Sequence, residues 1–452
     1  MAPRRMVVKT LNTKIAITIL VLFFINPSFV QALQLSASLY SKTEYTTNAR
    51  LESINTEDDV IERVGVNVLL NEERKRFNAN ARFNIYQEFY LNNTFSDQTQ
   101  LTTGFGLFNF DIVEEFLDWR TSFTRTDVLS DAAAVDTVDN REQRNTFRTG
   151  PTINYRMNQS STVRLGANYV QVINSDEGAA DTKRVDANAS YIYQYNSITD
   201  FSLNSNYDRV IEVKENGQTR SNSNEHLQNA SLNVGMNRQF SYGSFSAKVG
   251  RNEVRSEDRE TVSGNFFNIQ LEREQVFYHS VLAKYSESVS DSSIGFGSFE
   301  DLITANPDLS PASPILEVST QLDIIKQKRA NVSIKRNIDS YEYSISAFWI
   351  DLNYDIQNND ERSIGLVLNL RQNIQDGLTA GFTYRQVNQE LIDRPGDGDN
   401  VTQTYTIDSA YRWTKDFSTN GFVAYESREN NKQALREYED FSVGVTLKWD
   451  LY

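Results

Sequence analysis

The chain has 452 residues, with 45 Lys and Arg against 60 Asp and Glu, a formal net charge of −15, two His and no Cys. The absence of Cys excludes disulfides, zinc–thiolate sites and a cysteine nucleophile, and two His exclude a histidine-rich metal site. The acidic balance argues against nucleic acid as a partner, because nucleic-acid binders present a basic face. We therefore expect no cofactor, no metal site and no nucleic-acid partner.

The first 32 residues have the composition of a secretory signal peptide. An apolar run at 15–24 leads to a small-residue cleavage site that ends at Ala32, and four basic residues precede the run: Arg4, Arg5, Lys9 and Lys14. A membrane anchor is the alternative, but the run is short and Asn26 and Pro27 interrupt it. No later stretch approaches the roughly 18 apolar residues of a spanning helix. The sequence predicts a signal peptide at 1–32 and an exported domain at 33–452.

Residues 184–195 show the pattern that dominates the exported part of the chain. Apolar and aromatic side chains occupy the odd positions from Val185 to Tyr195, whereas the even positions carry polar side chains such as Arg184 and Asp186, with Ile192 as the exception. A period of two over twelve residues predicts a strand with one apolar and one polar face.

About 20 segments show this alternation. In chain order they are 35–46, 61–70, 76–90, 101–112, 116–126, 145–156, 160–172, 182–196, 198–212, 226–240, 242–254, 262–274, 277–288, 321–337, 340–353, 362–372, 376–389, 402–414, 417–428 and 438–451. The links after even-numbered segments are short, as at 157–159 and 196–197, and those after odd-numbered segments are long and polar, as at 127–144 and 213–225. Short turns on one side and long loops on the other are typical of outer-membrane barrels.

These features favour one architecture over its soluble alternatives. A β-helix would show a short fixed repeat, and a sandwich would bury one apolar face of each sheet. Here the polar face carries Arg, Asp, Asn and Gln in nearly every segment, which suits a wall between lipid and water. The sequence predicts an all-β fold: a transmembrane antiparallel up-and-down β-barrel of about 20 strands in the outer membrane, with short periplasmic turns and long acidic extracellular loops.

The texture of several strands matches a known family. The matching stretches are YSKTEYTTNAR at 40–50, RVDANASYIYQYNSITDFSLNSNYDRV at 184–210, KQKRANVSIKRNIDSYEYSISAFWID at 326–351 and DFSVGVTLKW at 440–449. In these stretches the chain resembles the outer-membrane β-barrels associated with exosortase (PEP-CTERM) systems and exopolysaccharide gene clusters, within a broader group of β-barrel porins. The resemblance implies a channel or accessory role in exporting polysaccharide or surface components, and it supplies no functional residues.

The polar phase of the strands gives the candidate site, an inward-facing set of basic side chains. Its members are Arg82, Arg120, Arg164, Arg184, Arg329, Lys335, Arg371, Arg385 and Arg412. Five acidic residues share the phase: Asp118, Asp186, Glu272, Glu342 and Asp408. One interpretation is a path for anionic or hydroxylated solutes, because guanidinium groups bind carboxylates and sugars. The other is that these charges pair across strands and solvate the wall.

The 289–320 segment is the longest link and contains Pro307, Pro311 and Pro314. It is either a constriction or cap inside the barrel, or an external loop. If it constricts, deleting 292–312 should raise single-channel conductance. We expect the partners of the protein to be outer-membrane lipid and lipopolysaccharide, the barrel-assembly machinery, and possible polysaccharide and export components. A general diffusion porin and a non-conducting structural or adhesion barrel remain alternative functions.

An enzymatic function is not expected. The two histidines, His226 and His279, fall at opposite ends of the predicted barrel and cannot share one site across an apolar band of roughly 25 Å. The sequence has no nucleophile elbow, no phosphate-binding loop and no dinucleotide fingerprint.

Overall fold

The computed structural model describes residues 34–129, 134–175, 181–213, 226–256, 259–276, 279–292, 322–355, 360–394, 396 and 398–451. The predicted signal peptide at 1–32 lies outside these residues and stays a prediction. Most of the 289–320 segment also lies outside them. No helix among the described residues is long and apolar enough to cross a membrane.

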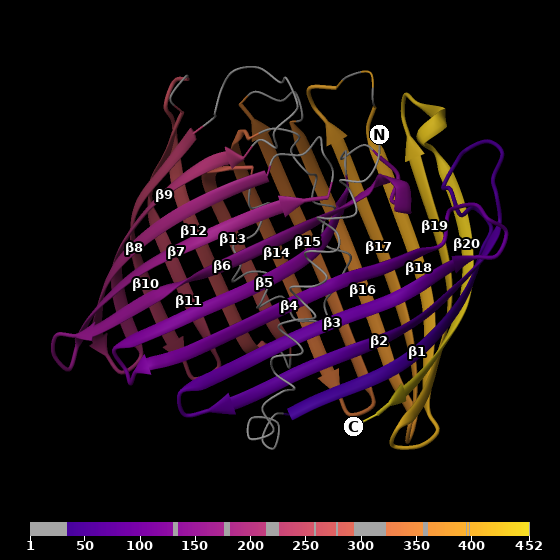
Figure 1. Ribbon diagram of the computed structural model, residues 1–452, viewed down its shortest axis with the longest axis horizontal. Helices are drawn as coiled ribbons and strands as arrows, with labels where there is room; N and C mark the ends of the chain where they lie inside the picture. The colour runs from indigo at the N-terminus through magenta and orange to yellow at the C-terminus, as the bar shows by residue number, and fades with distance from the viewer. Residues whose placement is uncertain are drawn as a thin grey trace, which may run out of the picture.

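Twenty antiparallel strands make up almost all of the described chain (Figure 1). They are β1 (Gln34–Thr46), β2 (Asp59–Arg74), β3 (Phe77–Tyr90), β4 (Gln98–Val113), β5 (Leu117–Leu129), β6 (Arg141–Arg156), β7 (Ser161–Asn174), β8 (Asp181–Asn196), β9 (Thr199–Val213), β10 (His226–Phe240), β11 (Gly243–Ser256), β12 (Val262–Val276), β13 (His279–Asp291), β14 (Ile324–Ile338), β15 (Tyr341–Tyr354), β16 (Glu361–Gln375), β17 (Leu378–Leu391), β18 (Asn400–Arg412), β19 (Phe417–Asn430) and β20 (Tyr438–Asp450). Two short 3-10 helices, η1 (Val138–Asn140) and η3 (Ala434–Arg436), lie in the loops before β6 and β20.

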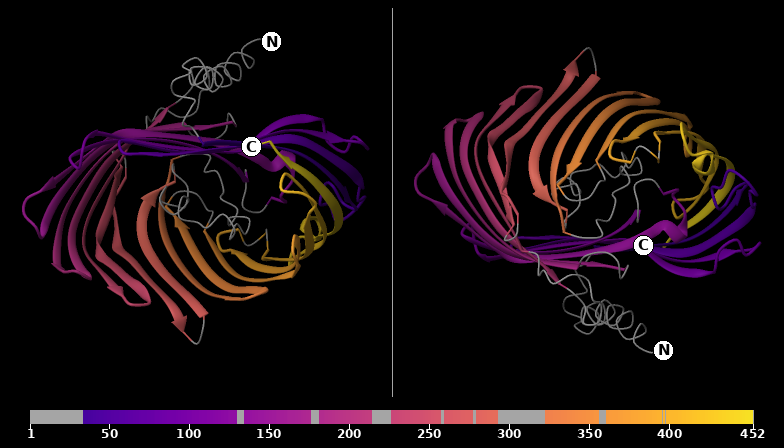
Figure 2. Two further views of the ribbon diagram at one scale, coloured as in Figure 1. Left: turned by 90° about the horizontal axis from the view of Figure 1, so that it is seen from below. Right: turned by 90° about the horizontal axis from the view of Figure 1, so that it is seen from above.

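Each strand pairs with the next along the chain, and β20 pairs with β1, so the sheet closes (Figure 2). The closing register runs from Ser38 opposite Asp450 to Thr46 opposite Ser442. Closure leaves no free edge, which a sheet needs in a bilayer because hydrocarbon cannot satisfy an open backbone group. The predicted fold class, an up-and-down barrel of about 20 strands, is confirmed.

The two ends of the barrel differ as the link lengths predict. Turns after even-numbered strands are short, such as 75–76 and 376–377, whereas links after odd-numbered strands are longer, such as 47–58. Gly377 has φ of 80°, a left-handed conformation that glycine adopts without steric cost in a tight hairpin turn. By the rule for such barrels, the short-turn end faces the periplasm and the long-loop end faces outward.

The alternation along β8 separates an outer from an inner face. Val185 is 59% exposed, and Tyr191, Tyr193 and Tyr195 lie on the same outward face. These side chains are exposed on the outside of the barrel, which suits contact with lipid. The intervening positions, such as Arg184, face inward with the polar side chains of the neighbouring strands.

Two irregularities interrupt the ladders. Pairing of β6 with β7 is missing at Pro151, between Thr149–Tyr169 and Thr152–Gly166, because proline has no backbone N–H to donate. The register of β3 and β4 shifts between Asn84 and Ile85, which is a bulge in β4. The bulge lies before the aromatic run of β4, so Phe105 and Phe110 of that strand face opposite sides of the wall.

Candidate functional site

The lumen narrows toward the long-loop end because two hairpins lean inward. The pairing of β12 with β13 stops at Phe267–Glu287, although β13 continues to Asp291 and stays paired with β14 up to Ile324. We call residues 288–292 and 322–326 the β13–β14 tip. The tip is not paired with β12, and it lies across the inner face of β10 and β11, which it contacts directly.

Apolar packing holds the β13–β14 tip against the wall. Val289 and Ile324 occupy positions that would face lipid in a straight strand. Here they form a buried cluster with Leu322 of the tip and with side chains from the inner face of the wall, which are Val210, Leu227 and Val254. Six buried apolar residues exclude water from this contact, so the tip is a second layer on the wall.

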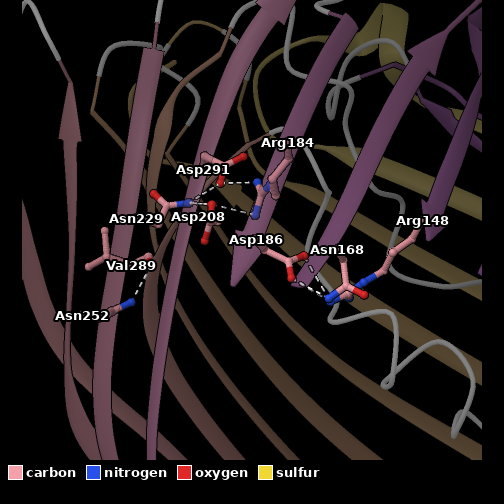
Figure 3. Close-up of polar contacts among 9 residues, drawn as sticks. All are labelled: Arg148, Asn168, Arg184, Asp186, Asp208, Asn229, Asn252, Val289 and Asp291. Carbon is pink, nitrogen blue, oxygen red and sulfur yellow. Dashed lines mark hydrogen bonds and ion pairs between the residues drawn. The ribbon is translucent and has the colours of Figure 1, made fainter. Parts of the chain in front are cut away.

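An ion-pair network beside this cluster ties the tip to β8, β9 and β10 (Figure 3). The Arg184 guanidinium pairs with Asp291 of the tip, and its Nη1 lies 3.2 Å from Oδ2 of Asp208. Asn229 Nδ2 donates to Oδ2 of Asp291 and to Oδ2 of Asp208, each at 2.7 Å. The cation and the amide lie between two carboxylates that would otherwise repel each other. We call these four residues the latch.

The second hairpin leans in from β5 and β6. The pairing of β4 with β5 stops at Gly104–Arg125, whereas β5 and β6 stay paired up to Leu129–Arg141. We call residues 126–129 and 141–144 the β5–β6 tip. The Gln143 side chain donates from Nε2 to Oε1 of Gln100 on the inner face of β4, at 3.0 Å. Beyond this tip, the Ala134 carbonyl accepts a hydrogen bond from Nη1 of Arg428 in β19 at 3.0 Å.

Beneath the β5–β6 tip, the inner wall of β1–β3 carries a second ionic cluster. Arg63 Nη1 lies 2.6 Å from Oε2 of Glu44, and the same guanidinium pairs with Glu88, which also accepts a hydrogen bond from the Tyr90 hydroxyl. Glu88 and Tyr90 are both buried although they are on the inner face. Their burial fits a wall that the tip covers.

Between the two tips the inner wall forms a groove of about 410 Å³. We call it the lumen groove. Ten of its 21 lining residues carry amides or hydroxyls, among them Thr146, Asn188, Asn206 and Ser231. Three arginines also line it: Arg144, Arg148 and Arg184. Neutral donors and acceptors beside guanidinium groups can bind hydroxylated or anionic molecules.

The arginines of the groove differ in their partners. Arg148 Nη2 lies 3.2 Å from Oδ2 of Asp186, whose Oδ1 accepts from Asn168 Nδ2 at 2.6 Å (Figure 3). Arg184 belongs to the latch. Arg144 donates from Nε to Oδ1 of Asn174 at 3.2 Å and forms no ion pair with a described residue.

The strand register places all nine predicted lumen-lining residues on the inner phase. They are distributed over β3, β5, β7, β8, β14, β16, β17 and β18, and do not converge on one point. Arg184 joins the latch, Lys335 Nζ lies 2.5 Å from Oε1 of Glu342, and Arg164 Nε donates to Oδ1 of Asn154 at 2.9 Å. The remaining six are Arg82, Arg120, Arg329, Arg371, Arg385 and Arg412. The set is therefore spread around the inner phase of the wall, and some members pair with neighbouring acids.

Sequence reasoning missed Arg144, Arg148 and Asp291. The alternation of β6, continued back from Thr152, puts both arginines on the inner phase, so the first two could have been found. Asp291 lies inside the segment predicted as a loop, and no local signal shows that β13 continues to it.

No protein-family model matches the chain, and no curated protein matches it in sequence. Solved structures with a similar fold include the siderophore receptor PirA from Pseudomonas aeruginosa, at 12% identity over 92% of this chain and 80% of that chain, with a TM-score of 0.47. The FrpB iron transporter from Neisseria meningitidis is 10% identical over 93% and 82% of the two chains, with a TM-score of 0.46. An anion-selective porin from Comamonas acidovorans is 10% identical over 93% and 99%, with a TM-score of 0.38.

The class of protein follows from the strand pairing and the outer face. A closed antiparallel barrel whose outward positions carry exposed apolar side chains satisfies its backbone internally and presents an apolar surface to lipid. The protein is an outer-membrane β-barrel.

Proposed function

We propose that the barrel is a narrow channel, or a channel component, for exporting exopolysaccharide or another surface component. The observation that carries this proposal is the lumen groove, where amides and hydroxyls line the inner wall between two inward-leaning tips. Sugars bind through many neutral hydrogen bonds, so a wall with amides and hydroxyls suits a hydroxylated, chain-like substrate. The strand texture shared with exosortase-associated barrels supports the same substrate class.

We propose that the barrel acts with the partners expected from its sequence and performs no catalysis. Lipid and lipopolysaccharide surround the barrel, the barrel-assembly machinery inserts it, and export components deliver the polysaccharide to the short-turn end. We propose a passive conduit with no enzymatic step and no cofactor.

Single-channel recording in planar bilayers tests the proposal. The refolded barrel should conduct in simple salt, and neutral oligosaccharides added to one side should block the current in a saturable way. Conductance that oligosaccharides do not block would favour a general diffusion porin. An inserted barrel that never conducts, even after deletion of 292–312, would favour a structural or adhesion role and would refute the channel.

A further inference from the structure

Arg144 is the feature of the lumen groove that the rest of the site does not explain. It is only 4% exposed, and it lies on the inner face of β6 among the residues that line the groove. Its one hydrogen bond with a described residue is from Nε to Oδ1 of Asn174. Glu142, which shares its strand and face, is close enough to act on its charge but forms no ion pair with it.

A buried arginine without a carboxylate partner is costly. An unpaired charge taken out of water loses hydration that only an opposite charge or several hydrogen bonds can replace. The other two arginines of the groove have this compensation, since Arg148 pairs with Asp186 and Arg184 pairs with Asp208 and Asp291. Among the described residues, Arg144 therefore has N–H donors that no neighbour accepts from, and it lies beside the groove.

The side chains around Arg144 indicate what kind of anion would bind to its guanidinium group. Thr124, Thr126 and Thr146 line the groove on the same inner faces of β5 and β6, and amides of β8 and β9 line its far side. The volume of about 410 Å³ lies within the range of roughly 300–1,000 Å³ typical of ligand pockets. Such a site suits a sugar that carries one carboxylate, because hydroxyls and amides bind the ring and the guanidinium binds the acid.

We infer that Arg144 and the threonines around it form an anion subsite of the lumen groove, and that its ligand is the carboxylate of an acidic sugar residue. The inference rests on the proposed function only for the identity of the ligand as a sugar. The site itself rests on the burial of Arg144, its single hydrogen bond and the groove beside it. The transported polymer would accordingly contain uronic-acid-like residues.

Calorimetric titration of the refolded full-length barrel in detergent tests the subsite without requiring conductance. The probes are trigalacturonate, neutral maltotriose and sodium acetate. Trigalacturonate should bind the wild type about 10- to 100-fold more tightly than maltotriose, the effect of one charge-assisted contact. Arg144→Gln should abolish this preference, whereas Arg156→Gln should keep it. Arg156 lies on the same strand at its short-turn end and contacts backbone carbonyls of the turn, so it is a matched control.

Each outcome is decisive. Equal binding of the acidic and neutral trisaccharides to the wild type, or an unchanged preference in Arg144→Gln, would overturn the subsite. Acetate that binds as tightly as trigalacturonate would overturn the assignment to a sugar. If Arg144→Gln does not show the heat-modifiable gel shift of a folded barrel, Thr146→Val takes its place and should weaken trigalacturonate binding. Oligosaccharide blockade without acid preference would leave the proposed channel intact and remove only this inference.

Discussion

The latch gives the sharpest prediction about stability. Asp291→Asn keeps the shape of the side chain but removes its charge, so Arg184 loses its ion pair with Asp291. The Asp291 side chain is 1% exposed, and the charge-assisted hydrogen bond of such a buried group contributes about 1.5–3 kcal/mol. Because Asp208 remains 3.2 Å from Nη1 of Arg184, the loss should stay below the roughly 3–5 kcal/mol of a fully broken buried pair.

Two measurements check this value. Urea unfolding of the barrel in lipid vesicles should show a lower midpoint for Asp291→Asn, corresponding to about 1.5–3 kcal/mol. The matched control is Asp450→Asn, which breaks a 2.8 Å ion pair with Lys448. The side chains of Lys448 and Asp450 are 44% and 49% exposed. Such an exposed pair contributes about 0.5 kcal/mol or less.

The second measurement follows the tip itself. The chain has no Cys, so Val289→Cys introduces the only thiol, at a buried position of the β13–β14 tip. Weakening the latch by the stated amount should raise the rate of thiol labelling by about 10- to 100-fold, since each 1.4 kcal/mol changes an equilibrium tenfold. Equal unfolding midpoints for Asp291→Asn and Asp450→Asn, together with unchanged labelling, would refute the view that the latch holds the tip.

Two further pairs of substitutions, each a variant and its control, test the wall of the barrel. Val185→Arg places a charge on the lipid-facing side of β8 and should lower the free energy of unfolding in vesicles by about 2–4 kcal/mol. The control, Asn188→Arg, lies on the inner face of the same strand and should lower it by less than about 1 kcal/mol. Equal losses for the two variants would contradict the assigned faces. Gly65→Ala should lower the free energy of unfolding by about 1–3 kcal/mol, because the added Cβ would lie 2.6 Å from Cβ of Tyr86. Gly421→Ala is the control, since the atom nearest to its added Cβ is 3.9 Å away. Identical thermal midpoints for the two variants would contradict the close packing at Gly65.

Much of the barrel could be predicted because its determinants are local. The alternation at 182–196 fixes both the strand, observed as Asp181–Asn196, and its two faces. Proline at 151 removes a donor wherever its strand lies, so the interrupted ladder could be predicted from one residue. Link lengths alone distinguished the two ends of the barrel.

The inward-leaning tips could not be predicted in this way. Whether β13 stays beside β12 beyond Glu287 depends on contacts such as Arg184 with Asp291, which are 107 residues apart. Which side chains of β4 face inward also depends on strand pairing. Phe105 faces inward opposite Arg82, so an aromatic side chain need not face lipid, and only the bulge near Asn84 sets its side. The alternation of polar and apolar residues does not show which strand ends separate from their neighbours.

The junction of β1 with β20 has a consequence for biosynthesis. Every other ladder joins consecutive strands and can form as soon as a hairpin has been synthesised, whereas Thr46 and Asp440, whose side chains hydrogen-bond at 2.6 Å, are 394 residues apart. A nascent or truncated polypeptide without β20 would expose the backbone of both β1 and β19. Periplasmic proteases and chaperones could therefore distinguish finished from unfinished molecules at this single junction.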